Sequence, residues 1–260
     1  MKLRIPYGNG EWQYGDLYLP EGKLQIPVVI LIHGGFWRAK YDLHLMDPMA
    51  EDLVNRGLAV WNMEYSRVSQ VGGGWPGTLL DAAHAVDFLR DLESTHSLDL
   101  EHVVVMGHSA GGHLALWLAG RHRLPADSPL YTNTAPLPFK GVISLAGVTD
   151  LELMWQVRQQ DSPVVDFLGG TPSEVPARYQ QASPKSLLPL SALQVLVHGT
   201  EDTNVPIELS KTYHDSAVAK GDDVVLLELP GVEHFKVIDP DSEVWPDIVD
   251  ALTAMLALGT

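Results

Sequence analysis

Residues 102–112 read His-Val-Val-Val-Met-Gly-His-Ser-Ala-Gly-Gly, and this stretch decides the fold. The apolar run 103–106 predicts a strand buried on both faces, as in parallel sheets. Residues 113–120 follow it with helix-forming Leu and Ala. A strand, the pattern Gly-x-Ser-x-Gly and a helix together form the context of a nucleophile elbow, a sharp turn that presents a serine hydroxyl. The stretch therefore predicts Ser109 as a nucleophile in an α/β protein.

The sharpness of that turn explains its two glycines. Ser109 is expected to adopt a strained backbone conformation, with Gly107 and Gly111 facing neighbouring backbone where a Cβ has no room. The following helix directs its N-terminus at whatever binds beside Ser109.

The rest of the chain alternates strand and helix patterns. Residues 1–20 predict two short antiparallel strands. This alternation implies a mostly parallel, twisted sheet with helices on both faces. Further strands are predicted at 28–32, 58–65, 141–148, 193–198 and 224–229, and helices at about 48–56, 78–92, 206–219 and 244–256.

Residues 151–190 break this alternation, because they carry several prolines and only short helical patches. They predict a small cap-like insertion. We therefore expect a single domain over residues 1–260, a length that is sufficient to bury a substantial core.

Composition excludes several classes of function. A net charge of −16 disfavours nucleic acid and anionic membrane surfaces as partners. The chain has no cysteine, so disulfides and a thiol nucleophile are excluded. It has neither the apolar segment of a secretory signal at its N-terminus nor a run of about 18 apolar residues. A cytoplasmic location is expected, while the oligomeric state stays open.

A serine hydroxyl needs a general base, and the base needs a carboxylate that orients it. His234 follows the last predicted strand and is the preferred base. Asp202 lies just beyond the preceding strand and is the preferred acid, so that the order is Ser, Asp, His. Glu201 and Asp150 are the alternative carboxylates, and both are less favoured.

Acyl transfer also needs N–H donors for the developing oxyanion. The backbone N–H of Ala110, the residue after Ser109, is one expected donor. The second is expected from residues 33–37, His-Gly-Gly-Phe-Trp, with Gly35 or Phe36 preferred over Trp37. His33 is interpreted as a structural hydrogen-bonding residue that holds this loop.

Through residues 33–37, residues 107–112, Asp202 and His234, the sequence resembles the α/β-hydrolase superfamily over nearly its whole length. The motif His-Gly-Gly-x-Trp is similar to the loop of kynurenine formamidases and related small carboxylesterases. Residues 199–206 resemble the acid loop of esterases related to prolyl oligopeptidases and dienelactone hydrolases. The resemblance implies an α/β-hydrolase fold and no cofactor.

The preferred function is a serine carboxylesterase that hydrolyses small or medium acyl or aryl esters through an acyl-enzyme. An arylformamidase acting on N-formylkynurenine uses the same residues and is the alternative. A hydrolase-fold binding protein without turnover is the third hypothesis. The expected partner is thus a small-molecule ester or amide.

Two further sets of residues bear on the substrate. Trp37 is predicted to bind substrate because it adjoins the residues expected to donate to the oxyanion, Gly35 and Phe36. Four other aromatic residues are weaker candidates for substrate binding: Phe36, Trp75, Trp155 and Phe167. Three arginines are candidates to bind a substrate carboxylate, although a solvated or ion-paired structural role is preferred for each: Arg67, Arg158 and Arg178. No metal is expected, because Asp42, His44 and Asp47 lack a recognisable ligand spacing.

Overall fold

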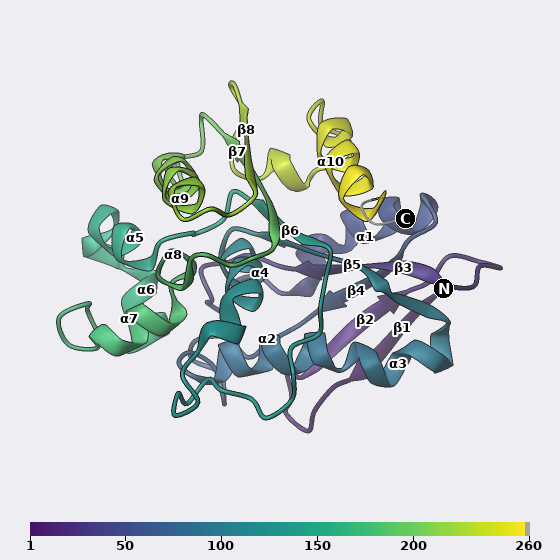
Figure 1. Cartoon of the computed structure of the whole chain (residues 1–260), viewed down its shortest axis with the longest axis horizontal. Coiled ribbons are helices and arrows are strands. Elements are labelled where there is room, and N and C mark those ends of the chain that lie inside the picture. Colours follow the sequence, from purple (N-terminus) through teal and green to yellow (C-terminus); the bar gives the residue numbers. More distant parts are fainter. Residues whose placement is uncertain (258–260) are drawn as a thin grey trace.

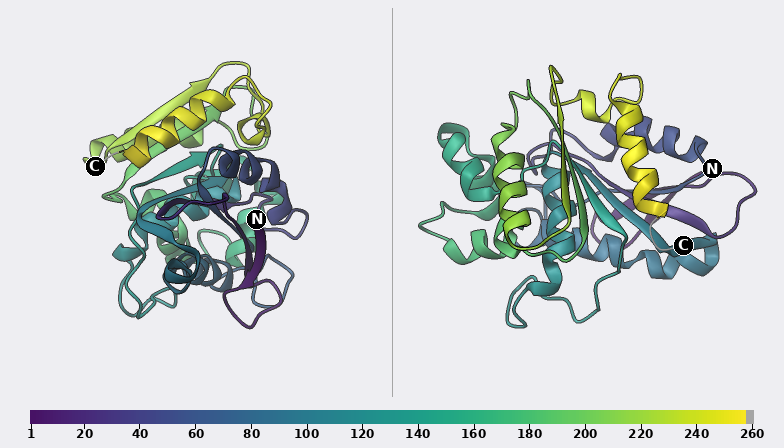
Figure 2. Two further views of the ribbon diagram at one scale, coloured as in Figure 1. Left: turned by 90° about the vertical axis from the view of Figure 1, so that its right-hand side faces the viewer. Right: turned by 45° about the horizontal axis from the view of Figure 1, so that its top comes forward.

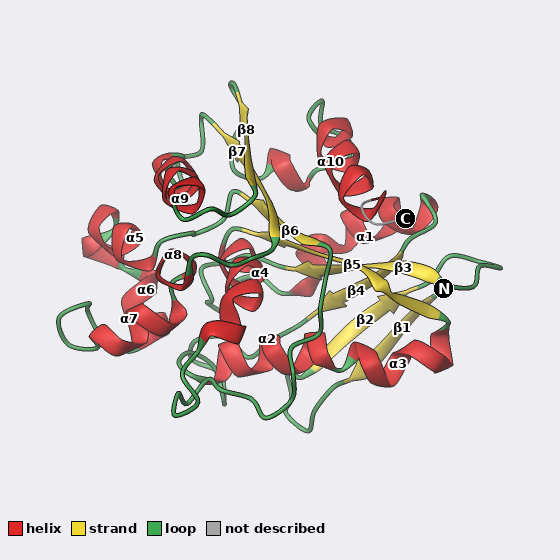
Figure 3. Cartoon of the chain, viewed as in Figure 1, coloured by secondary structure: helices red, strands yellow, loops and turns green. Residues whose placement is uncertain are grey.

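One twisted eight-stranded sheet forms the centre of the fold, and its strands lie in the order β1-β2-β4-β3-β5-β6-β7-β8 (Figures 1 and 3). The computed structural model describes residues 1–257, so the last three residues of the predicted domain 1–260 lie outside the described residues. β1 and β2 pair antiparallel, as do β2 and β4, and all other neighbours are parallel. The strands are β1 (Lys2–Pro6), β2 (Tyr14–Tyr18), β3 (Ile26–Ile32), β4 (Ala59–Met63), β5 (Leu98–His108), β6 (Gly141–Leu145), β7 (Leu193–Gly199) and β8 (Val224–Leu229).

Helices cover both faces of this sheet, because side chains of a strand alternate between its faces. In β3, Val28 and Ile30 belong to one hydrophobic cluster, and Val29 and Leu31 belong to a second. Residues of α2, α3, α4 and α9 belong to the first cluster, and residues of α1 and α10 belong to the second. The two sets of helices lie on opposite faces of the sheet (Figure 2). These helices are α1 (Asp47–Asn55), α2 (Gly77–Asp87), α3 (Leu89–His96), α4 (Ala110–Gly120), α9 (Glu208–Ala219) and α10 (Trp245–Ala257).

The predicted α/β-hydrolase architecture is therefore confirmed, while several element boundaries differ; for example, the strand predicted over 141–148 ends at Leu145. The single helix expected over 78–92 is divided between α2 and α3 at Phe88. β5 begins at Leu98, earlier than the apolar run at 103–106. No helix within residues 1–257 combines the length and the apolar character needed to cross a membrane.

The segment expected as a cap-like insertion lies between β6 and β7 and forms short helices: α5 (Leu151–Val157), α6 (Pro163–Leu168), α7 (Pro176–Ala182) and α8 (Pro184–Leu187). Pro occupies the first turn of the last three, a position where its missing N–H costs nothing. Met154, Phe167 and Tyr179 are buried in the same cluster as the sheet. The segment between β6 and β7 thus packs against the main hydrophobic core.

Parallel pairing brings the functional loops to one edge of the sheet. Ile32 of β3 pairs with Gly107 of β5, and His108 pairs with Leu145 of β6. The loops that follow β3, β5, β7 and β8 consequently leave the same carboxyl edge, where ligands bind in such sheets.

Candidate active site

Ser109 occupies a strained turn between β5 and α4. Its φ is 56° and its ψ is −116°, a combination that costs a non-glycine residue about 1–3 kcal/mol. A Cβ on Gly107 would lie 2.0 Å from the carbonyl oxygen of Gly111, and a Cβ on Gly111 would lie 2.0 Å from that of Ile32. The prediction that these glycines have no room for side chains is confirmed. Ser109 is buried, and its contact with solvent is through a pocket that it helps to line.

The loops after β7 and β8 bring Asp202 and His234 together. His234 Nδ1 lies 2.6 Å from Asp202 Oδ2, while Asp202 Oδ1 accepts the backbone N–H groups of Asn204 and Val205 at 2.8 and 2.9 Å. Because an ionised carboxylate only accepts, Nδ1 of His234 is the donor in this contact, and Nε2 is the ring nitrogen left to exchange a proton with Ser109. Ser109 and His234 line the same pocket.

The two alternative carboxylates lie elsewhere. Glu201 is exposed. Asp150 forms an ion pair with Lys185 at 2.9 Å and caps α5 by accepting the N–H groups of Glu152 and Leu153. Of the three predicted carboxylates, Asp202 is thus the one against His234.

A second histidine, His198 near the end of β7, supports Asp202. The buried ring of His198 places Nε2 2.8 Å from the carbonyl oxygen of Val205 and 3.3 Å from Asp202 Oδ2. Burial alone would raise the pKa of the Asp202 carboxyl, but hydrogen bonds from His198 and His234 outweigh it and hold that pKa well below its usual range. Asp202 is therefore ionised at neutral pH and can orient an imidazole.

Backbone N–H groups near Ser109 are available to an oxyanion, and the N–H of Trp37, the less favoured donor, likewise has no protein acceptor among residues 1–257. In the part of the chain that the structure describes, the N–H groups of Gly35, Phe36 and Ala110 donate to no protein acceptor. Gly35 has φ 118° and Phe36 has φ 55°, so this loop also holds left-handed backbone. A Cβ on Gly34 would lie 3.0 Å from Ser109 Cβ, which shows how closely the loop approaches the elbow.

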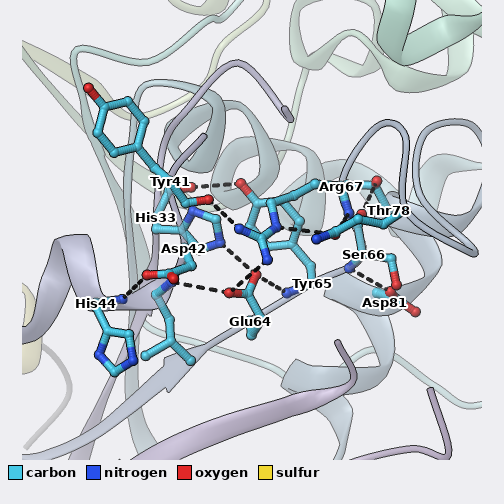
Figure 4. Close-up of polar contacts among 12 residues, drawn as sticks. His33, Tyr41, Asp42, His44, Glu64, Tyr65, Ser66, Arg67, Thr78 and Asp81 are labelled. Carbon is cyan, nitrogen blue, oxygen red and sulfur yellow. Dashed lines mark hydrogen bonds and ion pairs between the residues drawn. The ribbon is translucent and has the colours of Figure 1, made fainter. Parts of the chain in front are cut away.

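A buried polar network fixes this loop (Figure 4). His33 Nδ1 lies 2.8 Å from the Gly34 carbonyl oxygen and Nε2 lies 2.9 Å from Glu64 Oε1. Because N–H and C=O point in opposite directions across a trans peptide, this contact turns the N–H of Gly35 away from His33. His33 thus holds the loop as predicted.

Glu64 is the centre of the network and was missed in the sequence. Its carboxylate accepts the N–H groups of Leu43 at 3.2 Å and Tyr65 at 2.8 Å, and lies 3.4 Å from the Arg67 guanidinium. Burial would raise the pKa of Glu64, but His33 and Arg67 together lower it below its ordinary value. The position of Glu64, directly after the buried strand β4, is the sequence feature that could have indicated its role.

His108, the variable residue of Gly-x-Ser-x-Gly, was also missed. Its buried ring places Nε2 3.0 Å from the carbonyl oxygen of His234, and the two ring centroids are 4.5 Å apart. Burial, together with the nearby His234, lowers the pKa of His108 to about 3. A neutral His108 therefore holds the backbone of His234 by donating from Nε2.

The pocket beside Ser109 has a volume of about 280 Å³ and aromatic walls. Phe36 belongs to the loop of residues 33–37, Tyr41 follows that loop, and Phe235 is the residue after His234. Phe235 is 43% exposed, so a ligand can cover it. Tyr41 and Phe235 were not predicted, since nothing in the local sequence distinguishes them from core aromatics.

The prediction that Trp37 binds substrate is wrong. Its side chain has no exposed surface and lies outside the pocket lining. The indole stacks on Phe167 with centroids 4.5 Å apart, and its N–H donates to His113 Nδ1 at 3.2 Å. Backbone at φ 58° turns Trp37 inward, so it anchors the loop to the core. Trp75, Trp155 and Phe167 also lie outside the pocket lining.

The three arginines divide into two structural residues and one pocket residue. Arg67 is buried and donates to the carbonyl oxygen of Tyr41, and Arg178 donates to that of Leu168 at 2.7 Å. Arg158 instead lines the pocket, with its guanidinium 4.9 Å from the ring centroid of Phe36. Arg158 is half-buried at the pocket and forms no ion pair within residues 1–257, so the solvated role remains a prediction and the ion-paired role does not apply to it.

Of Asp42, His44 and Asp47, at which no metal is expected from the sequence, the structure brings the last two together with Asp16 instead of Asp42. Asp16, His44 and Asp47 have ligand atoms within 4.8 Å of one another, whereas Asp42 caps the N–H of His44. Asp16 is paired with Arg4 at 2.7 Å and Lys2 at 3.1 Å, so its charge is already matched.

Sheet order, elbow and rim loops together define an α/β-hydrolase. The chain belongs to the BD-FAE family, whose model matches residues 15–216. Esterase LipQ of Mycobacterium tuberculosis is 26% identical over 241 residues, covering 88% of this chain and 56% of LipQ. Kynurenine formamidase of Salmo salar is 25% identical over 257 residues, covering 91% of this chain and 76% of the formamidase. This chain thus spans little more than half of LipQ.

Among solved structures, esterase B from Lactobacillus rhamnosis is similar in fold, with a TM-score of 0.83 and 19% identity. The match covers 98% of this chain and 85% of that structure.

Proposed function

We propose that this protein is a serine carboxylesterase acting on small or medium acyl or aryl esters. The observation that carries the proposal is the convergence at one pocket of Ser109 and a His234 whose Nδ1 is hydrogen-bonded to Asp202 at 2.6 Å. The similarity to LipQ, which is named an esterase, supports the same reaction class.

In the proposed acylation step, Ser109 Oγ attacks the ester carbonyl while His234 Nε2 accepts its proton. Asp202, ionised and held by its own hydrogen bonds, stabilises the imidazolium that forms. The negative charge that develops on the carbonyl oxygen is received by the N–H of Ala110 and by that of Gly35 or Phe36. Such donors are fixed before the reaction and need no reorganisation.

Collapse of the tetrahedral intermediate expels the alcohol, which takes the proton from His234. The acyl group is then carried by Ser109. Water attacks this ester with His234 as the base, and the same donors hold the second oxyanion. Collapse of that intermediate breaks the bond to Ser109 Oγ, which takes the proton back from His234 as the carboxylic acid is released. We assign positioning roles to His108, which lines the pocket and holds the backbone of His234, and to the Glu64 network, which holds the loop of residues 33–37 (the oxyanion loop) through His33.

The test is a Ser109→Ala variant assayed with p-nitrophenyl esters. Loss of a serine nucleophile lowers kcat by about 10⁶. Ser173→Ala, at an exposed serine outside the pocket, is the matched control. Fluorophosphonate is expected to label the wild type and the control but not Ser109→Ala. Wild-type protein that neither turns over esters nor labels would instead be a hydrolase-fold binding protein.

The second candidate is an arylformamidase, favoured by the similarity to a kynurenine formamidase. The same nucleophile, base and donors would cleave a formamide. Values of kcat/KM for N-formylkynurenine and p-nitrophenyl esters, measured side by side, separate the two: a formamide value well above all ester values would replace the carboxylesterase.

A further inference from the structure

Cationic side chains gather around the pocket of a strongly acidic chain. Arg38, Lys40 and Arg158 line the pocket, together with the single carboxylate of Asp161, while the whole chain carries a net charge of −16. The charge of the pocket lining is thus opposite in sign to the net charge of the chain.

Arg38 already has carboxylate partners. Its guanidinium lies 2.8 Å from an oxygen of Asp161 and 2.6 Å from one of Asp166. Arg38 follows the oxyanion loop, and both aspartates belong to the segment between β6 and β7. These two ion pairs therefore connect the loop that carries Arg38 to the segment between β6 and β7, and they neutralise the charge of Arg38.

Arg158 differs in this respect. Among residues 1–257 the guanidinium of Arg158 forms no ion pair and no hydrogen bond. Asp161 is nevertheless near enough that the charges of Arg38 and Arg158 both lower the pKa of the Asp161 carboxyl. The guanidinium lies over the ring of Phe36, 4.9 Å from its centroid. That cation–π contact holds the plane of the group while leaving its N–H edge to other partners.

Lys40 is the second unmatched cation of the pocket. Its ammonium group lies 5.1 Å from the ring centroid of Tyr41 and, within the described part of the chain, has no carboxylate partner. Two cations therefore face one cavity, each lying over an aromatic wall.

We infer that Arg158, assisted by Lys40, binds an anionic group of the substrate, so that the preferred esters carry a carboxylate. This inference rests on the proposed esterase function. The guanidinium fork matches a carboxylate in two parallel hydrogen bonds. Because Phe36 belongs to the oxyanion loop, a carboxylate held on Arg158 is placed at a fixed offset from the ester carbonyl.

The inference is tested with matched esters that differ in one charge. Mono-p-nitrophenyl glutarate and p-nitrophenyl valerate place the difference in the acyl group, and 4-acetoxybenzoate and 4-acetoxybenzamide place it in the leaving group. The readout is the ratio of kcat/KM for the anionic ester to kcat/KM for its neutral partner. At least one pair is expected to give a wild-type ratio well above one.

Arg158→Gln is expected to lower that ratio by about ten- to a hundredfold, as expected for loss of a charge-assisted hydrogen-bonded pair. Arg158→Lys should fall between the two, because it keeps the charge and loses the fork. Arg123→Gln removes the same charge from an exposed site outside the pocket and should leave the ratio unchanged.

A merely structural Arg158 would change both esters of a pair equally. A wild-type ratio at or below one for both pairs, or a ratio unaltered in Arg158→Gln, would overturn the inference while neutral-ester turnover leaves the proposed function standing. Absence of turnover of all four esters, with no fluorophosphonate labelling of Ser109, would overturn the esterase proposal and this inference with it.

Discussion

Replacing Glu64 with Gln tests whether the buried network holds the oxyanion loop. The substitution keeps the shape of the side chain but removes a fully buried charge that accepts two backbone N–H groups and faces His33 and Arg67. Arg67, 2% exposed, then keeps a charge without a counter-ion. Removing one partner of a buried pair costs about 3–5 kcal/mol, a large part of the about 5–15 kcal/mol that stabilises a typical domain.

Urea unfolding at neutral pH measures the free energy of unfolding of Glu64→Gln, Arg67→Met and the double variant. Because the double variant removes both charges, its loss is expected to be smaller than the sum of the single losses by about 2 kcal/mol. Arg56→Gln, which breaks an exposed ion pair with Asp52, is the control and should cost less than about 1 kcal/mol.

Activity gives the second readout of Glu64→Gln. A displacement of the oxyanion loop by about 1 Å lowers kcat/KM by about a hundredfold. A Glu64→Gln variant with wild-type stability and wild-type kcat/KM would refute the positioning role of the network.

Three further predictions follow from buried contacts. Trp37→Phe leaves His113 Nδ1 without a donor and should lower the free energy of unfolding in urea by about 1–3 kcal/mol. KM for esters should stay within about twofold of the wild-type value, because Trp37 lies outside the pocket lining. A raised KM at unchanged stability would instead indicate that Trp37 contacts the substrate. Gly34→Ala places a Cβ 2.9 Å from the backbone oxygen of His108 and 3.0 Å from Ser109 Cβ, so kcat should fall by about a hundredfold, and full activity would mean that the loop yields freely. Burial lowers the pKa of His113 to about 4, below the value of about 6.5 in the unfolded chain, so the stability that its neutral ring contributes is complete above pH 6.5 and is lost as the pH falls towards 4. The loss is about 3 kcal/mol over that range, and His113→Gln should flatten the pH dependence of the unfolding free energy; an unchanged slope would contradict a neutral His113.

Much of the fold could be predicted because its signals are local. The apolar run 103–106 and the elbow that follows it need only sequence neighbours to be recognised, and the same holds for the prolines at the starts of α6, α7 and α8. The boundary between α2 and α3 could not be predicted in this way. Leu79 and Leu89 continue one helical pattern, and both are buried.

The site residues likewise differ in whether local sequence could predict them. Ser109, Asp202 and His234 each follow a strand, and chain order alone suggested their grouping. Trp37 was misplaced because an aromatic residue next to a functional loop gives no sign of which way its backbone turns.

The sequence by itself determined the strand–turn–helix unit around Ser109, the alternation that builds a parallel sheet, and the residue types available at its carboxyl edge. Only the tertiary structure decided which of those residues meet. Glu64 reaches His33 across 31 positions of sequence and His108 reaches the carbonyl of His234 across 126, distances over which no periodicity carries information. It likewise decided that Trp37 faces the core and Arg158 the pocket, because side-chain direction depends on φ and on the surfaces that pack against each loop.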